Sequence, residues 1–191
     1  GEFAITAQAL AQHHVKLLPP LIPRHLYAIG LNYLDHVGEL DFAKQLPIEP
    51  ISFLVSSQAV IGHEEYIILN EANCRIDEEA ELAVVIGKNG YQIAESQALD
   101  YVLGYTCGND VSNRHRQNQD GQWFRAKSYP TYKPLGPWIE TSLDPSDLEI
   151  TATLNGQIVQ RGRTSQLLFS VPKLIAFLSS FTPLYAGDVI M

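Results

Sequence analysis

The sequence predicts a β-rich α+β fold, in which short strands outnumber helices. The clearest strand is 80–87 (AELAVVIG), which is rich in β-branched residues and ends at a glycine. Asn155-Gly156 separates two alternating runs and predicts a hairpin, because both turn positions accept a positive φ. Only a few short segments repeat apolar residues at helical spacing, so the helices should be few and modest.

In the first half of the chain, glycine and proline bound most of the expected elements. A short helix or arm is expected up to Pro19-Pro20, and a buried strand should stop at Gly30. The expected elements in order are a helix or arm at 4–19, a strand at 26–30, a short polar helix or turn at 32–40, a loop at 43–50, and strands at 51–55, 66–69 and 80–87.

In the second half, apolar residues at helical spacing predict a helix over 94–103, stopped by Gly104. A strand over 105–110 follows. The polar segment 115–134 is interrupted by two prolines and is interpreted as a long functional loop. The remaining elements are hairpin strands at 148–154 and 157–161 and a helix that begins after Ser170 and continues through Leu178, with Pro172 in its first turn.

The composition favours one domain and argues against two classes of partner. The chain has 191 residues, 46% of them hydrophobic, which is enough for one sizeable core. Thirteen Lys and Arg against 21 Asp and Glu give a net charge of −8, which argues against nucleic acid or an anionic membrane as the main partner. No membrane-spanning run and no signal peptide are evident, and two cysteines are too few for a disulfide framework. A cytoplasmic location is therefore expected.

Three acidic residues form the first candidate site. Glu79 and Glu81 are two positions apart, so on a strand their carboxylates point to the same face. Two like charges beside an apolar core are costly unless a cation lies between them, and oxygen ligands suit magnesium, calcium or manganese. Asp110 ends another expected strand and would supply a third oxygen. The alternative is a solvated strand edge, because Asp77 and Glu78 make the whole stretch acidic.

A second candidate pair is His36 and Glu39. Three positions apart on a helix, they would share a face, and the carboxylate would orient the imidazole as a general base. The alternative is an ordinary surface pair.

A third constellation follows Asp110 in the sequence. Its polar and cationic side chains would hold a substrate carboxylate or a developing oxyanion, or would simply be solvated loop charges. Its members are Arg114, Gln117, Arg125 and Lys127.

These constellations lie inside ordered motifs that resemble the fumarylacetoacetate hydrolase (FAH) family. Residues 30–39 (GLNYLDHVGE) resemble the family pattern GxNYxxHxxE, and 79–88 (EAELAVVIGK) resemble ExELAVVIGK. Residues 104–114 (GYTCGNDVSNR) are similar to GYTxxNDxSxR. Further similarity lies in Lys127-Ser128 followed by PLGPW at 134–138, in the Asn155-Gly156 hairpin, and in GDVI at 187–190. Among its members, the pattern most resembles the homoprotocatechuate-pathway 2-hydroxyhepta-2,4-diene-1,7-dioate isomerase and decarboxylase group.

The resemblance implies a fold and an activity. The fold would be the mixed β-sandwich roll of the FAH C-terminal domain, with a few short helices, in a homodimer. The activity would be that of a hydrolase, isomerase or decarboxylase that requires Mg2+ or Mn2+, with Ca2+ an alternative in crystals. It would act on a small-molecule 2-oxo acid or its enol, a dicarboxylate or acylpyruvate of aromatic catabolism, through a metal-bound enolate. The other interpretation is a catalytically inactive binding member or interaction scaffold of the same fold.

The resemblance also implies a role for each matching residue. The metal ligands would be Glu79, Glu81 and Asp110; the catalytic residues would be His36, Glu39 and Lys127; and the substrate-binding residues would be Arg114 and Gln117.

The domain boundaries and three departures from the family pattern also follow from the resemblance. Residues 1–23 would be an arm or the remnant of a preceding region, and 24–191 the catalytic domain, with its last strands expected beyond Met191. Leu31 stands where many hydrolases carry Arg, Val55 where many members carry Lys, and Pro130 where Asp is usual. These departures indicate an altered substrate preference.

Overall fold

The computed structural model describes residues 15–33, 46–71 and 73–191. Its strands are β1 Leu26–Gly30, β2 Ile51–Val55, β3 Val60–Ile61, β4 Ile76–Asp77, β5 Ala80–Ile86, β6 Val102–Asn109, β7 Ser112–Asn113, β8 Lys133–Glu140, β9 Glu149–Leu154, β10 Gln157–Arg163 and β11 Val189–Ile190. Its helices are η2 Ser57–Ala59, η3 Glu95–Tyr101, α2 Arg114–Asp120, α3 Phe124–Lys127, η4 Thr164–Gln166 and α4 Val171–Phe181, where η marks a 3-10 helix.

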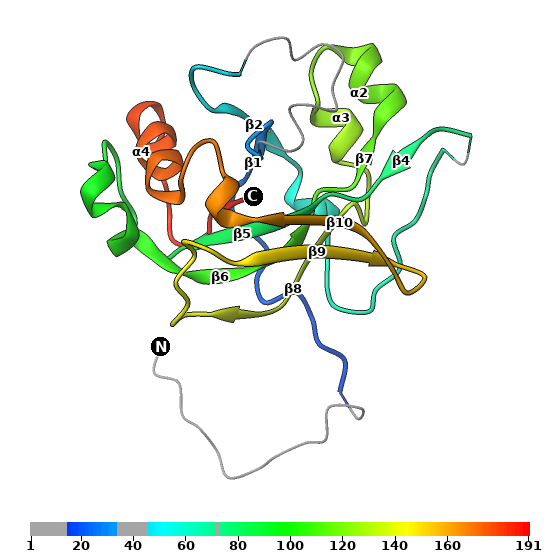
Figure 1. Ribbon diagram of the computed structural model, residues 1–191, viewed down its shortest axis with the longest axis horizontal. Helices are drawn as coiled ribbons and strands as arrows, with labels where there is room; N and C mark the ends of the chain where they lie inside the picture. Colours follow the sequence, from blue (N-terminus) through cyan, green and yellow to red (C-terminus); the bar gives the residue numbers. More distant parts are fainter. Residues whose placement is uncertain (1–14, 34–45, 72) are drawn as a thin grey trace.

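A seven-stranded mixed sheet in the order β2-β1-β11-β5-β6-β8-β3 organises the molecule. Strands β5 and β6 pair antiparallel at its centre, and β1 runs parallel to β11. Two smaller pairs, β9 with β10 and β4 with β7, complete the strands of the described chain. In Figure 1, α4 and η3 lie at one end of the sheet, α2 and α3 lie at the other, and the β9–β10 hairpin crosses in front of β5 and β6. The predicted β-rich α+β fold with few helices is confirmed.

The two faces of β5 belong to different parts of the core. Val84 and Ile86 pack against α4 and η3, whereas Ala83 and Val85 pack on the other face, with Leu135 of β8. This separation follows from the alternation of side chains along a strand. Extending the alternation to Glu81 places its carboxylate on the face of Ala83 and Val85, away from α4.

Helix α4 begins where the sequence predicted. The Ser170 side chain caps the helix by accepting a hydrogen bond from the Lys173 amide. Leu174, Ile175 and Leu178 are buried on one face of the helix, which covers the sheet. The helix extends to Phe181, three residues beyond the predicted end.

The predicted hairpin is confirmed. Among the described residues, one side chain forms the hydrogen bonds between this hairpin and the main sheet. Asn155 and Gly156 both have a positive φ, 51° and 80°, as the turn requires. The Gln160 side chain on β10 accepts a hydrogen bond from the Ala80 amide at 2.7 Å and donates one to the Ala80 carbonyl at 3.0 Å. The Gln160 amide group thus pairs with the β5 backbone as a neighbouring peptide group would.

Two element predictions, a strand over 66–69 and a loop over 115–134, are wrong. The segment 66–69 forms no strand; the amide of Ile68 donates to the Thr131 hydroxyl instead of to a ladder, and Tyr66 is 90% exposed. The helix predicted over 94–103 is present as the shorter 3-10 helix η3, which ends at Tyr101 because β6 begins at Val102. Gly104 therefore stops no helix; it lies within β6, where a Cβ would collide with the Glu140 carbonyl.

The segment 115–134, predicted to be a loop, contains the helices α2 and α3. Asn113 caps α2 by accepting a hydrogen bond from the Arg116 amide, and Gly121 ends the helix with φ of 68°. Pro130 and Pro134 lie after both helices and interrupt neither.

Most of the segments predicted over 4–19 and 32–40 lies outside the described residues. No helix in the described ranges is long and apolar enough to span a bilayer.

Candidate functional site

The carboxylates of Glu79, Glu81 and Asp110, called the carboxylate cluster below, converge at the ends of two adjacent central strands. Glu79 precedes β5 and Asp110 follows β6, and the Asp110 amide donates to the Glu79 carbonyl at 2.8 Å. The ladder between β5 and β6 thus extends by one bond to fix both residues. The alternation along β5 brings Glu81 to the same face.

Lys127 lies between two members of the cluster. Its Nζ donates to Glu79 Oε2 and to Asp110 Oδ2, each at 2.5 Å. The side chain extends from the end of α3 and is 5% exposed, and Nζ lies 5.9 Å from the centre of the Phe53 ring. Burial alone would lower the pKa of Lys127, but the charges of Asp110 and Glu79 outweigh it and raise that pKa. Lys127 is therefore a firmly charged ammonium.

Glu81 is the least compensated carboxylate of the three. It takes part in no salt bridge within the described chain, whereas Glu79 and Asp110 each have two. Burial, followed by the charges of Glu79 and Asp110, raises the pKa of Glu81 well above its ordinary value. The neighbouring Tyr33 hydroxyl and the Lys127 charge offset only part of this effect. Within the described chain, the cluster as folded therefore leaves Glu81 without an ion-pair partner.

Arg114, at the start of α2, supports the cluster from outside. It donates to Asp77 at 2.8 Å, to Gln117 at 2.8 Å and to Glu79 at 2.6 Å. The sequence predicted that Arg114 and Gln117 face the substrate; in this structure the guanidinium binds Gln117 and two carboxylates. Arg125 pairs with Asp120 on the surface.

Two residues that contact the cluster, Ser112 and Lys133, were not predicted from the sequence. Ser112 donates to Glu79 Oε2 at 3.0 Å. Lys133 is 1% exposed, and its Nζ lies 2.8 Å from Asp110 Oδ1. Burial outweighs the single Asp110 charge and lowers the pKa of Lys133, whereas Lys127, with two carboxylate partners, shifts the other way. Lys133 lies at the end of the segment 115–134, which was predicted to be a polar loop, so its burial was not predicted.

His36 and Glu39, the predicted general-base pair, lie outside the described residues, as does the rest of 34–45. Tyr33, the last described residue before that segment, is buried, and its hydroxyl interacts with Glu81.

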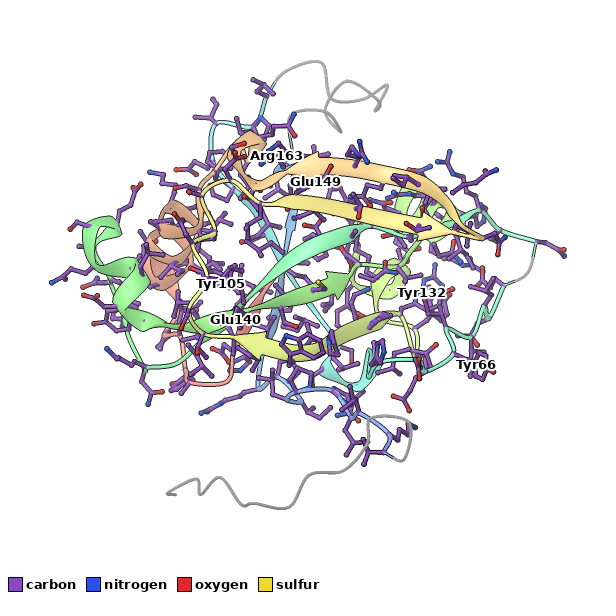
Figure 2. All side chains as sticks on the ribbon, turned by 60° about the horizontal axis from the view of Figure 1, so that its bottom comes forward. Tyr66, Tyr105, Tyr132, Glu140, Glu149 and Arg163 are labelled. Atoms are coloured by element: carbon purple, nitrogen blue, oxygen red, sulfur yellow. The ribbon has the colours of Figure 1, made fainter. Side chains whose placement is uncertain are left out.

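One large cavity of the described chain has neither Glu79 nor Asp110 in its lining. A trough of about 910 Å³ separates the β9–β10 hairpin from β5, β6 and β8, and its lining includes Leu82, Cys107 and Ile150. Figure 2 shows Glu149 on the hairpin side of this trough and Tyr105 and Glu140 on the sheet side. Glu81 borders the trough, but strand alternation directs its carboxylate to the opposite face. The carboxylate of Glu81 therefore lies across the sheet from the trough.

The three carboxylates of the cluster are suitable ligands for a hard divalent cation. In this structure, two of them instead form ion pairs with Lys127. In the described ranges, no three His, Cys, Asp or Glu side chains are spaced to hold a metal ion as they stand. The ammonium of Lys127 lies between Glu79 and Asp110. Asp110 Oδ1 is a buried oxygen that accepts no hydrogen bond within the described chain, despite its ion pair with Lys133. Three converging carboxylates, one of them uncompensated, are the oxygen ligands that Mg2+ and Mn2+ prefer.

Comparison with known proteins gives the family. Residues 25–191 match the family described as fumarylacetoacetate (FAA) hydrolase C-terminal. The crystal structure of 5-carboxymethyl-2-hydroxymuconate delta-isomerase from Mycobacterium smegmatis is 42% identical, with a TM-score of 0.87, over 97% of this chain and 73% of that one. The 2-hydroxyhepta-2,4-diene-1,7-dioate isomerase from Mycobacterium marinum is 37% identical, with a TM-score of 0.87, over 98% and 69%.

A named relative from an animal is also similar. The rat protein named oxaloacetate tautomerase Fahd2a, mitochondrial, is 37% identical over 97% of this chain and 64% of its own length. The carboxylate cluster lies within the matched residues, and the expected sheet-rich fold with few short helices is the one found. The chain therefore belongs to the fumarylacetoacetate hydrolase C-terminal family and is an enzyme of that family.

Proposed function

We propose that the chain is a divalent-metal-dependent enzyme that acts on a 2-oxo acid or its enol at the carboxylate cluster. The observation that carries the proposal is the convergence of Glu79, Glu81 and Asp110 around the buried ammonium of Lys127. The names of the similar proteins, two dienoate isomerases and an oxaloacetate tautomerase, support a proton-transfer reaction next to a 2-oxo acid.

Glu79, Glu81 and Asp110 would hold Mg2+ or Mn2+, and the ammonium of Lys127 would have to withdraw from between two of them. A cation bound there supplies Lewis-acid stabilisation of negative charge on a substrate oxygen. The uncompensated charge of Glu81 favours such a cation, because its repulsion by Glu79 and Asp110 would be relieved.

The protein's own residues would perform the remaining steps. Lys127, charged and held close to the cluster, would donate a hydrogen bond to the oxygen that becomes negative in an enolate. Arg114 and Ser112 hold Glu79 in place while Lys127 moves. His36, oriented by Glu39, would take or return the proton on carbon, a role carried over from the family resemblance.

Thermal unfolding with Mg2+ or Mn2+, each with and without oxalate, tests the site. Oxalate resembles the planar enolate of pyruvate, so we expect a metal-dependent rise in Tm that oxalate increases further. Glu81→Gln should abolish the rise, and Glu95→Gln, on the exposed helix η3, should retain it. If neither ion changes Tm, the proposed metal site is wrong.

Turnover assays then separate the reactions. Oxaloacetate enolisation and the isomerisation of hydroxymuconate-type dienes are followed by ultraviolet absorbance, and release of pyruvate reports cleavage of acylpyruvates. A His36→Ala variant with unchanged turnover of every substrate would contradict the base assignment.

A further inference from the structure

Lys133 is a fully buried lysine that the proposed chemistry does not use. It is the first residue of β8, directly after Tyr132, whose place in the fold is labelled in Figure 2. Its Nζ donates to the carbonyl oxygen of Val111 at 3.1 Å and to that of Tyr132 at 3.0 Å, and it lies 2.8 Å from Asp110 Oδ1. Two main-chain carbonyl oxygens thus accept hydrogen bonds from this ammonium, and Asp110 Oδ1 is its ion-pair partner. Because the two carbonyl oxygens belong to the main chain, the ammonium is fixed in place.

The two lysines divide the oxygens of Asp110 between them. Lys127 contacts Oδ2, the oxygen on the side of Glu79, whereas Lys133 contacts Oδ1 from the strand β8. Asp110 is itself 5% exposed, so water has little access to either oxygen. A carboxylate held in this way presents a single oxygen to the carboxylate cluster.

We propose that Lys133 is a positioning residue that holds Asp110 through Oδ1, so that only Oδ2 is available to bind a cation at the carboxylate cluster. The consequence for the cation rests on the proposed function. Mg2+ requires near-octahedral geometry and binds through few carboxylate oxygens, whereas Ca2+ accepts bidentate carboxylates in a larger, flexible shell. An Asp110 restricted to one oxygen therefore favours Mg2+ over Ca2+.

The interaction between Lys133 and Asp110 is tested in metal-free protein by a double-mutant cycle of Lys133→Met and Asp110→Asn. Lys133→Met leaves the buried Asp110 with one cation in place of two, and we expect Tm in EDTA to fall by roughly 6–12 °C. Asp110→Asn removes the charge that Lys133 neutralises, so the double variant should recover about half of that loss. If the effects of the two changes on Tm are additive, Lys133 and Asp110 are not coupled and the proposal is overturned. Lys173→Met, at an exposed position of α4, is the matched control and should leave Tm unchanged.

The consequence for cation choice is tested by titrating Mg2+ and Ca2+ separately into the wild-type protein and the Lys133→Met variant in a calorimeter. A released Asp110 can offer both oxygens, so the ratio of the Ca2+ to the Mg2+ association constant should rise by roughly tenfold. A residue with a purely structural role would lower Tm without changing this ratio, so an unchanged ratio overturns the positioning role in selectivity. If the wild-type protein binds neither ion, the proposed function fails. The double-mutant cycle in EDTA still decides whether Lys133 holds Asp110 in place.

Discussion

Replacing Lys127 with methionine should destabilise the metal-free protein strongly, although it removes no apolar contact. Lys127 is 5% exposed on its side chain and is the only cation that bridges Glu79 and Asp110 within the described chain. Methionine keeps the length and apolar stem of the side chain but removes the charge, leaving two nearby carboxylates in a buried environment.

The remaining partners set the magnitude of this effect. Removing one partner of a buried ion pair costs about 3–5 kcal/mol. Arg114 still contacts Glu79 and Lys133 still contacts Asp110, so we expect the lower end, about 3 kcal/mol. For a chain of this size, each kcal/mol lowers Tm by about 2–4 °C, which gives a fall of roughly 6–12 °C.

Urea and thermal unfolding in EDTA, followed by circular dichroism, measure this change. Lys88→Met is the matched control, because Lys88 is exposed and pairs with no carboxylate in the described chain; it should change the free energy of unfolding by less than about 0.5 kcal/mol. If Lys127→Met cost no more than Lys88→Met, the ion-pair network of the cluster would not stabilise the fold, and the reasoning above would be refuted.

Three further predictions concern other parts of the molecule. Burial and its acidic neighbours raise the pKa of Glu81 well above its ordinary value of 4.5, so the ionised side chain destabilises the metal-free fold. Glu81→Gln should therefore raise Tm in EDTA at about pH 8, and this gain should shrink as the pH falls and disappear below pH 4.5, as the carboxyl becomes protonated in the unfolded chain as well. The pKa of Glu71 is lowered from 4.5 to about 2, chiefly by the hydrogen bond that it accepts from Arg116. The ionised side chain therefore stabilises the fold fully above pH 4.5, and this contribution is lost as the pH falls towards 2. In Glu71→Gln, the free energy of unfolding should accordingly fall less steeply between pH 4.5 and 2 in an acid-unfolding experiment. Leu178→Ala in α4 should cost about 2–5 kcal/mol in urea unfolding, and Leu103→Ala, at a half-exposed position, far less.

The elements that the sequence predicted correctly are those with a local cause. The Asn155-Gly156 turn needs two positive φ values, Ser170 caps its own helix, and 80–87 is too apolar to be anything but a central strand. Each signal lies within a few residues of the element that it specifies.

The elements that were missed depend on distant partners. Residues 66–69 have the composition of a strand, but no strand within the described ranges pairs with them. Val102 would continue a helix on local spacing, and it joins β6 because Ile86 of β5 is its partner. Helices α2 and α3 are short and polar, and their apolar-face signal was too weak to outweigh the prolines that follow.

The same division holds for the candidate site. Spacing along β5 predicted that Glu79 and Glu81 share a face, and pairing of β5 with β6 brings in Asp110. The second cation could not be predicted, because a lysine in a segment predicted to be a polar loop gives no sign that it is buried or of which acid it will contact. Lys133 contacts Asp110 because Asp110 and Val111, which join β6 to β7, lie beside the start of β8.

The link between Gln160 and Ala80 has a consequence for how the molecule opens. In the described chain, the β9–β10 hairpin pairs with no strand of the main sheet, and its hydrogen bonds to β5 come from the side-chain amide of Gln160. Hydrogen exchange should therefore divide the chain into two units, with the hairpin amides exchanging through local opening and those of β5 and β6 only through global unfolding. The Ala80 amide should exchange with the hairpin although it belongs to β5, because the bond that protects it breaks when the hairpin lifts away.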